Sequence, residues 1–324
     1  MANRVPGATG RVQGAAGRVQ GAGRRAQGAA GRVQGAGRRA QGAGRRAQGA
    51  AGRVQGNSAR QYHIALGPGE LAEYVLLCGD PDRAARVAGL FDEVRLERRH
   101  REYVTYTGKW NGLELSVMST GIGADNTEIA VIEISQICHR PTLVRIGSCG
   151  TLREEVRIGD LVISAGAVRL ENTSTFFVHE GYPAFADYEV LMALVAAAGR
   201  KGLRHQVGLT ATAPGFYGAQ CREVEGFPLR KPDLIRELAA QGVLNYEMET
   251  SALLTLSTLR GLRAGAVCAV YAHRPSGRFI AEKDIPEAEL RCIEAGMEAV
   301  RILARMDEVK KAAGAARWTP ELRI

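Results

Sequence analysis

The chain has 324 residues, of which 45% are hydrophobic and 24% are charged, so it is long enough for one large domain or two ordinary ones. The formal net charge of +9 is unevenly spread: residues 1–60 carry twelve arginines and no acidic residue, which leaves −3 for the other 264 residues. This distribution argues against a nucleic-acid-binding folded domain, and no apolar run reaches the ~18 residues of a membrane-spanning helix.

The first segment, residues 1–60, is an irregular repeat of arginine, glycine, alanine and glutamine. Glycine recurs every few residues, which costs about 1 kcal/mol per position in a helix, and the segment contains no aromatic residue. Because it has little to bury in a core, we predict a disordered tail. Its charge leaves open a weak interaction with nucleic acid through counterion release.

From residue 61 to 308, short apolar runs alternate with helical patterns, which is typical of an α/β fold. The predicted strands are 74–80, 113–123, 142–150, 160–168, 206–213 and 264–274. The predicted helices are 125–138, 188–201, 232–241, 248–260 and a last one from "DIPEAEL" to about Met306. We therefore expect a single-domain three-layer sandwich, a central mixed β-sheet flanked by helices, followed by a loose C-terminal tail at 309–324.

The six cysteines are scattered without a CxxC pair, and several lie in apolar runs. This pattern predicts buried free thiols in a reducing compartment. With no signal-peptide core after Met1, the sequence predicts a soluble cytoplasmic protein.

Glycine-bearing polar motifs follow most of the apolar runs: "GDPDR", "TGIG", "RIGSCG", "GFYGAQCRE", "YEME" and "HR". In open α/β sheets, ligands bind beyond the carboxyl ends of the strands. We therefore expect these motifs to converge on one pocket.

Several of the motifs supply groups that bind anions. In "GDPDR", Gly79 lets backbone N–H groups approach an anion and Arg83 adds a forked cation; an exposed arginine in a turn is the alternative. Arg145 lies within an apolar run, where a buried guanidinium needs an anionic partner, either a ligand or a structural carboxylate. Together with Arg101 and the hydroxyl of Ser148, these residues predict a cradle for inorganic phosphate.

Two further motifs supply groups of another kind. Gln220 donates and accepts, Arg222 only donates, and in an extended segment their spacing would point both side chains the same way. Phe216 adds an aromatic wall, so these residues suit a flat polar ligand. In "NYEMET", the acidic residues Glu247 and Glu249 flank Met248, and acids placed there for the helix dipole are one interpretation of this motif.

From about His63 to Asp307, the chain resembles the uridine phosphorylases of the nucleoside phosphorylase-I family. The matching motifs occur in family order and are "GDPDR", "HRE", "STGIG", "RIGSCGT", "IGDLVIS", "FYGAQCRE", "NYEMET" and "GLRAGAV". The resemblance implies reversible phosphorolysis of uridine to uracil and ribose 1-phosphate, in pyrimidine salvage or catabolism. It also implies phosphate as a co-substrate and no organic cofactor.

The resemblance assigns roles to individual residues. Phosphate is held by Gly79, Arg83, Arg145 and Ser148, and Arg101 completes the site from the neighbouring subunit of a homodimer. Dimers of this kind can assemble further into a hexamer. The expected catalytic residues are Arg83, Arg145 and Arg222, of which the last stabilises negative charge on the departing base.

The sugar and the base are assigned in the same way. The ribose residues are Glu247, Met248 and Glu249, with His63 of the neighbouring subunit at the 5′-hydroxyl. The uracil residues are Phe216, Gln220, Arg222 and Arg274.

Bacterial members of the family bind a monovalent cation between subunits through a glutamate, a backbone carbonyl and a serine. Glu102 and Ile122 match this set. Asn126 stands in the place of the serine, which puts the cation in question.

Three other functions stay open. A purine nucleoside phosphorylase of the same fold would carry an aspartate after the strand at 266–271, where this chain reads "YAHRPSG" and where we expect His273 to be structural. A nucleosidase that uses water would have no purpose for the phosphate-binding arginines. The third is a catalytically weak nucleoside-binding protein whose basic tail binds nucleic acid.

Overall fold

The computed structural model describes residues 60–324, so the predicted disordered tail lies outside the described residues, apart from Arg60. Within 60–324, no helix combines the length and the apolar character that crossing a membrane requires. The cysteines in this part of the chain are all free thiols, and four of the six are buried, as predicted.

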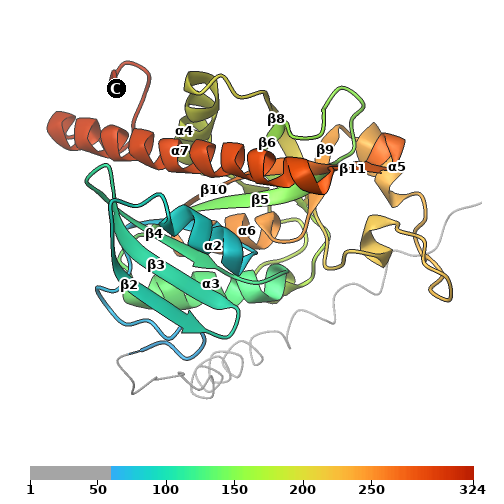
Figure 1. Cartoon of the computed structure of the whole chain (residues 1–324), viewed down its shortest axis with the longest axis horizontal. Helices are drawn as coiled ribbons and strands as arrows, with labels where there is room; N and C mark the ends of the chain where they lie inside the picture. The colour runs from blue at the N-terminus through green and yellow to red at the C-terminus, as the bar shows by residue number, and fades with distance from the viewer. Residues whose placement is uncertain (1–59) are drawn as a thin grey trace, which may run out of the picture. The chain divides into compact units, whose positions relative to one another are not determined.

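A mixed sheet forms the middle layer of the fold (Figure 1). Its strands are β1 (Tyr74–Cys78), β2 (Glu93–His100), β3 (Tyr103–Trp110), β4 (Leu113–Ser119), β5 (Thr142–Thr151), β6 (Leu161–Arg169), β7 (Ala184–Phe185), β8 (His205–Thr212), β9 (Val243–Glu247), β10 (Arg263–His273) and β11 (Arg278–Phe279). The strand order is β11-β10-β6-β8-β9-β5-β1-β4-β3-β2, and β7 pairs with β6. An additional pairing joins β5 to β10, so that β10, β6, β8, β9 and β5 close on themselves.

Helices cover both faces of this sheet. One side carries α2 (Pro81–Ala88), α4 (Tyr188–Arg200) and α7 (Ile285–Ala313), and the other carries α3 (Ala124–Ile137) and α6 (Thr250–Arg260). Figure 1 shows β5 between the long α7 and α6. The remaining helix, α5 (Leu234–Ala240), packs with β9 in a smaller cluster.

The core explains why the layers form. Along β1, Leu76 packs into the cluster with α2, α4 and α7, whereas Val75 and Leu77 pack into the cluster with α3 and α6. Successive side chains of a strand point to opposite faces, so a strand between two helical layers must be apolar throughout. All five residues of β1 are buried. The predicted three-layer α/β sandwich is therefore confirmed.

The predicted strands and helices all occur in the structure, and apart from the end of α7 their bounds lie within a few residues of those expected. Neither α2 nor the hairpin of β2 and β3 was predicted. The strand β2 lies at the edge of the sheet and is charged and largely exposed, so it lacks an apolar pattern. With only eight residues, α2 is too short to show a helical period clearly.

The C-terminal end of the chain differs from the prediction. The helix α7 continues to Ala313 instead of ending near Met306, and Trp318 beyond it is buried. The ring of Trp318 stacks on Tyr188 with 6.4 Å between centroids, and its backbone N–H donates to Glu189 at 2.9 Å. The segment after 308 is therefore not entirely loose, because one large aromatic side chain gains a buried site against α4.

A cluster of charged groups joins the end of α7 to β10 and β1. Asp307 accepts hydrogen bonds from both terminal nitrogens of Arg263 at 2.7 Å and from the hydroxyl of Tyr74 at 2.6 Å, and it lies 2.8 Å from Lys310. Burial alone would raise the pKa of Asp307, but the partners Arg263, Lys310 and Tyr74 outweigh burial and lower this pKa from 3.8 to about 2.

Replacing Asp307 with asparagine should lower the free energy of unfolding by about 2 kcal/mol at neutral pH, since each unit of pKa shift corresponds to about 1.4 kcal/mol. A lowered carboxyl pKa stabilises the fold above the unfolded value of 3.8 and ceases to do so as the pH falls through about 2. The difference between variant and wild type should therefore vanish below about pH 2. Urea unfolding across this range tests it, with the exposed Glu308→Gln change as the control. An equal loss at all pH values would contradict it.

Candidate active site

The polar motifs meet at one edge of the sheet. The strands β1, β5 and β10 run parallel, so their carboxyl ends lie on the same side of the sheet. Gly79 follows β1, Arg274 follows β10, and the second half of β5 lies at the same place. The loops after β1 and β4 are in close contact, since a Cβ at Gly79 would lie 3.1 Å from the carbonyl oxygen of Gly121. The strand β9 runs antiparallel to β5 and pairs with Gly150 and Thr151, which brings its last residue back beside β5. The polar motifs therefore converge as predicted. The shared direction of parallel strands does not explain this fully, because β9 runs in the opposite direction to β5.

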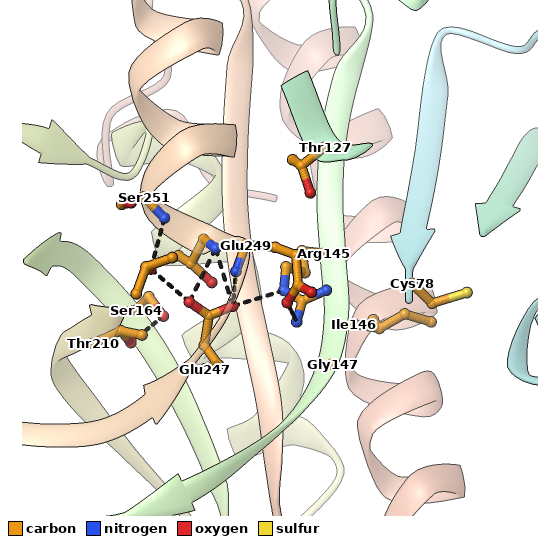
Figure 2. Close-up of polar contacts among 12 residues, drawn as sticks. Cys78, Thr127, Arg145, Ile146, Gly147, Ser164, Thr210, Glu247, Glu249 and Ser251 are labelled. Atoms are coloured by element: carbon orange, nitrogen blue, oxygen red, sulfur yellow. Dashed lines mark hydrogen bonds and ion pairs between the residues drawn. The ribbon is translucent and has the colours of Figure 1, made fainter. Parts of the chain in front are cut away.

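Arg145 lies at the centre of this edge, between two carboxylates (Figure 2). It is buried, and its Nε donates to Glu247 at 3.1 Å while its Nη2 donates to Glu249 at 2.5 Å. The sequence left open whether the anionic partner of Arg145 is a ligand or a structural carboxylate, and the structure contains two structural carboxylates beside it. The third nitrogen, Nη1, makes no hydrogen bond to the described residues 60–324, so it is a donor left for a ligand.

The two carboxylates differ in the number of hydrogen bonds that they accept. Glu247 accepts from the hydroxyl of Thr212 at 2.6 Å and from the backbone N–H groups of Glu249 and Thr250 at the start of α6. Glu247 therefore stabilises the N-terminus of α6, which agrees with the alternative that acidic residues lie here because of the helix dipole. Glu249 also accepts from the backbone N–H of Gly123 at 2.6 Å, and within residues 60–324 it has fewer hydrogen-bond partners than Glu247. Burial raises the pKa of Glu249, Arg145 opposes this rise, and Glu247 reinforces it.

Arg83 belongs to the first turn of α2, and its side chain is buried, so the alternative of an exposed arginine is wrong. Its Nε donates to Glu289 of α7, and its Nη1 donates to the carbonyl of Ile146 at 3.3 Å. Glu289 also pairs with Arg86 at 2.7 Å. Glu289 was not predicted from the sequence, because a glutamate near the start of a long helix resembles many surface residues.

The residues Gln220 and Arg222 form a second cluster at the same edge. Nη2 of Arg222 lies 3.5 Å from Oε1 of Gln220, and the guanidinium carbon of Arg222 lies 4.1 Å from the ring centroid of Phe216. Nη2 of Arg274 donates to the carbonyl of Gln220 at 2.7 Å. The four residues predicted at the base are therefore in mutual contact.

The extended conformation expected for this segment is wrong. Residues Gly218–Gln220 form the short 3-10 helix η3, and Cys221 adopts a left-handed conformation with φ 50°. The backbone N–H of Arg222 then donates to the carbonyl of Tyr217 at 2.9 Å. A tight turn, rather than the two-residue repeat of a strand, brings the amide and the guanidinium together.

The electrostatics of the second cluster are unusual. Within residues 60–324, neither Arg222 nor Arg274 has a carboxylate partner, and the Nε of each is buried without a hydrogen bond. Burial, followed by the repulsion from Arg274, lowers the pKa of Arg222 to about 10, and burial also lowers the pKa of Arg274. Both guanidinium groups are half-buried, and a partly desolvated cation without a counter-charge is unfavourable, so this end of the site suits a ligand that carries or develops negative charge.

The other predicted site residues are placed as follows. Ser148 lies half-buried in β5, and Met248 lies half-buried between the two glutamates. Arg101 is exposed in the turn between β2 and β3, with its guanidinium 5.3 Å from the ring of Tyr62. His63 lies 2.7 Å from Glu133 through its Nδ1. Within the described chain, neither Arg101 nor His63 forms a hydrogen bond or ion pair with the Arg83 and Arg145 clusters.

Comparison with known proteins places this geometry in a family. Residues 73–306 match the family model described as the phosphorylase superfamily. The chain belongs to the phosphorylase superfamily.

Similar members of the superfamily share most of their length with this chain. A uridine phosphorylase from Thermococcus kodakarensis is 46% identical over 265 residues, which cover 81% of this chain and 94% of that protein. A uridine phosphorylase from Escherichia coli is 36% identical over 247 residues, covering 75% and 97%. The crystal structure of a uridine phosphorylase from Vibrio fischeri superposes with a TM-score of 0.68 at 28% identity, covering 77% of this chain and 99% of that one.

Two of the three residues considered for a monovalent cation, Glu102 and Asn126, lie close together. A Cβ at Gly121 would lie 2.7 Å from Nδ2 of Asn126 and 3.0 Å from Cγ of Glu102, so these two side chains meet there. The amide nitrogen of Asn126 donates hydrogen bonds, whereas its amide oxygen is a group that ligates cations. The side chain of Ile122 is 72% exposed.

His273 is structural, as predicted. Its Nδ1 lies 2.8 Å from the hydroxyl of Ser276, and it caps the 3-10 helix η4 (Arg274–Ser276). No carboxylate follows β10 at this point, since the next residues are Arg274, Pro275 and Ser276.

Proposed function

We propose that this chain catalyses the reversible phosphorolysis of uridine to uracil and ribose 1-phosphate. The observation that carries this proposal is the pair of half-buried guanidinium groups, Arg222 and Arg274, which lie beside Gln220 and have no carboxylate partner in residues 60–324. The Nε of each is buried without a hydrogen bond. Uracil departs with negative charge over its two oxygens, and fixed donors stabilise charge that develops in the transition state. The identity to proteins named uridine phosphorylase supports the same reaction.

The base is recognised by complementary hydrogen bonds. The uracil edge presents an acceptor, a donor and an acceptor. The amide of Gln220 donates and accepts, and the guanidinium of Arg222 only donates, so together they match all three groups. Phe216 contacts the flat face of the uracil ring, and Arg274 lies near the uracil oxygen O4.

Phosphate is the nucleophile and is held by Arg83, Arg145 and Ser148 beside Gly79. Both arginines already carry carboxylate partners in the described chain, so their charge is largely balanced before phosphate binds. We propose that Arg101 of a second copy supplies the missing positive charge. Active sites are then shared within a homodimer, and His63 of the second copy reaches the 5′-hydroxyl of the ribose.

The ribose lies between these two clusters. Glu249, which has the fewer partners of the two glutamates, accepts from the 2′- and 3′-hydroxyls, while Met248 covers the sugar face. Glu247 keeps Arg145 and the start of α6 in place. Catalysis then consists of positioning and electrostatic stabilisation, without an organic cofactor. The free thiols support a reducing, cytoplasmic setting for this pyrimidine salvage step.

Phosphate dependence tests the proposal. The purified chain should release uracil from uridine only when inorganic phosphate is present, with one ribose 1-phosphate formed per uracil. Equal turnover without phosphate would indicate a nucleosidase, and faster turnover of inosine would indicate a purine enzyme. Binding of uridine without turnover would favour the weakly catalytic alternative.

Deletion of residues 1–59 tests the role of the basic tail. If the site lies wholly in the described domain, kcat and KM for uridine should stay within about twofold of the full chain. A loss of turnover greater than tenfold would contradict this expectation. A fluorescent single-stranded DNA measures the nucleic-acid alternative, because only the full chain should bind it, and binding should weaken steeply with salt.

A further inference from the structure

A short hairpin follows β10 at the base end of the site. The strand β11 pairs antiparallel with β10, so that Phe279 lies opposite Ala272. The backbone N–H of Ile280 donates to the carbonyl of Tyr271 at 2.7 Å, and the hairpin turns at Gly277 with φ 68°. These contacts give Phe279 a defined position beyond the end of β10.

The side chain of Phe279 is 56% exposed, which is high for an aromatic ring next to a buried polar cluster. Its ring centroid lies 4.9 Å from the guanidinium carbon of Arg222, and that of Phe216 lies 4.1 Å from the same atom. The cation of Arg222 therefore contacts two aromatic rings that come from distant segments of the chain.

This arrangement holds an arginine without neutralising it. A carboxylate partner would fix Arg222 but would also cancel its charge and occupy its N–H groups. An aromatic face attracts the guanidinium through its quadrupole and leaves the N–H edge free. Arg222 has no carboxylate partner in residues 60–324, so the two rings, together with Oε1 of Gln220 at 3.5 Å, stabilise its charge before a ligand arrives.

We propose that Phe279 is a positioning residue for the base site. Its ring fixes the guanidinium of Arg222 by a cation–π contact, so that the N–H edge beside Gln220 is ready for the pyrimidine. This inference rests on the proposed function. It adds a residue that belongs to none of the motifs by which the chain resembles its family.

The test compares Phe279→Leu with Phe279→Tyr. Leucine keeps an apolar side chain without a π face, so it should raise KM for uridine and lower kcat/KM by about 2- to 30-fold, the range expected of a cation–π contact. KM for phosphate should stay unchanged, because Arg83 and Arg145 are untouched. Tyrosine keeps the ring and should restore kcat/KM to within about twofold. The exposed Phe227→Leu is the matched control, because no cation–π contact involves its ring.

Calorimetric binding of uracil provides a readout that does not require turnover. The Leu variant should bind uracil more weakly and the Tyr variant about as tightly as the wild type, whether or not phosphorolysis occurs. If the wild type binds uracil but shows no phosphate-dependent turnover, the proposed function fails, and the two affinities still decide the role of Phe279. Wild-type affinity in the Leu variant would overturn the inference, as would an equal loss in both variants.

Discussion

Replacing Arg145 with methionine is expected to lower the free energy of unfolding by about 3–5 kcal/mol and to abolish measurable phosphorolysis. The guanidinium is buried between Glu247 and Glu249, and its removal leaves both carboxylates buried without a cation. Breaking a buried ion pair from one side has this large effect because the remaining charge cannot return to water. Urea unfolding measures the loss of stability.

Two further variants separate the causes of this loss. Arg305→Met removes an arginine from an exposed pair with Glu308 and should change stability by less than about 1 kcal/mol. Adding Glu249→Gln to Arg145→Met removes one of the two stranded charges and should recover part of the stability, with activity still absent. A loss below 1 kcal/mol in Arg145→Met alone would contradict the buried pairing.

Replacing Arg222 with methionine should lower activity strongly without lowering stability. We expect kcat/KM for uridine to fall by about 100- to 1000-fold, the usual effect of removing a donor to developing charge. Stability should be unchanged or slightly higher, because the variant removes a half-buried cation that lacks a carboxylate partner in residues 60–324. KM for phosphate should not change. Steady-state kinetics and thermal unfolding together measure these quantities.

Arg230→Met, an exposed change eight residues away, is the control and should leave kinetics and stability unaltered. Arg222→Lys keeps the charge but loses the planar fork, so it should recover only part of the activity. Uridine kinetics within threefold of wild type in Arg222→Met would mean that the guanidinium does not contact the base.

These two predictions reflect two uses of arginine at one sheet edge. At the proposed phosphate end, carboxylates fix Arg83 and Arg145, and their charge is shared with Glu289, Glu247 and Glu249. At the proposed base end, aromatic rings contact Arg222, which has no carboxylate partner in residues 60–324. The first arrangement contributes to stability. The second opposes stability and is explained by a ligand.

The sequence by itself determined the fold class, the edge at which the site forms and the chemical types of the groups there. Apolar periodicity is a local property, so β1, β5 and β10 could be located from their own residues. Arg145 could be named because a charged residue within an apolar run needs a partner, and Gln220 and Arg222 could be named because their polar motif follows the apolar run of β8. Edge strands such as β2 were missed, because charged and exposed residues carry no such period.

The tertiary structure alone decided which groups meet. Glu289 and Phe279 lie far along the chain from Arg83 and Arg222, and no local pattern encodes those contacts. The reversed direction of β9 placed Glu247 beside Arg145, and the left-handed Cys221 turned Gln220 towards Arg222. Partner choice and burial depend on packing between distant segments. Whether an arginine has a carboxylate partner depends on this packing, so only the folded chain distinguishes a paired cation from an unpaired one.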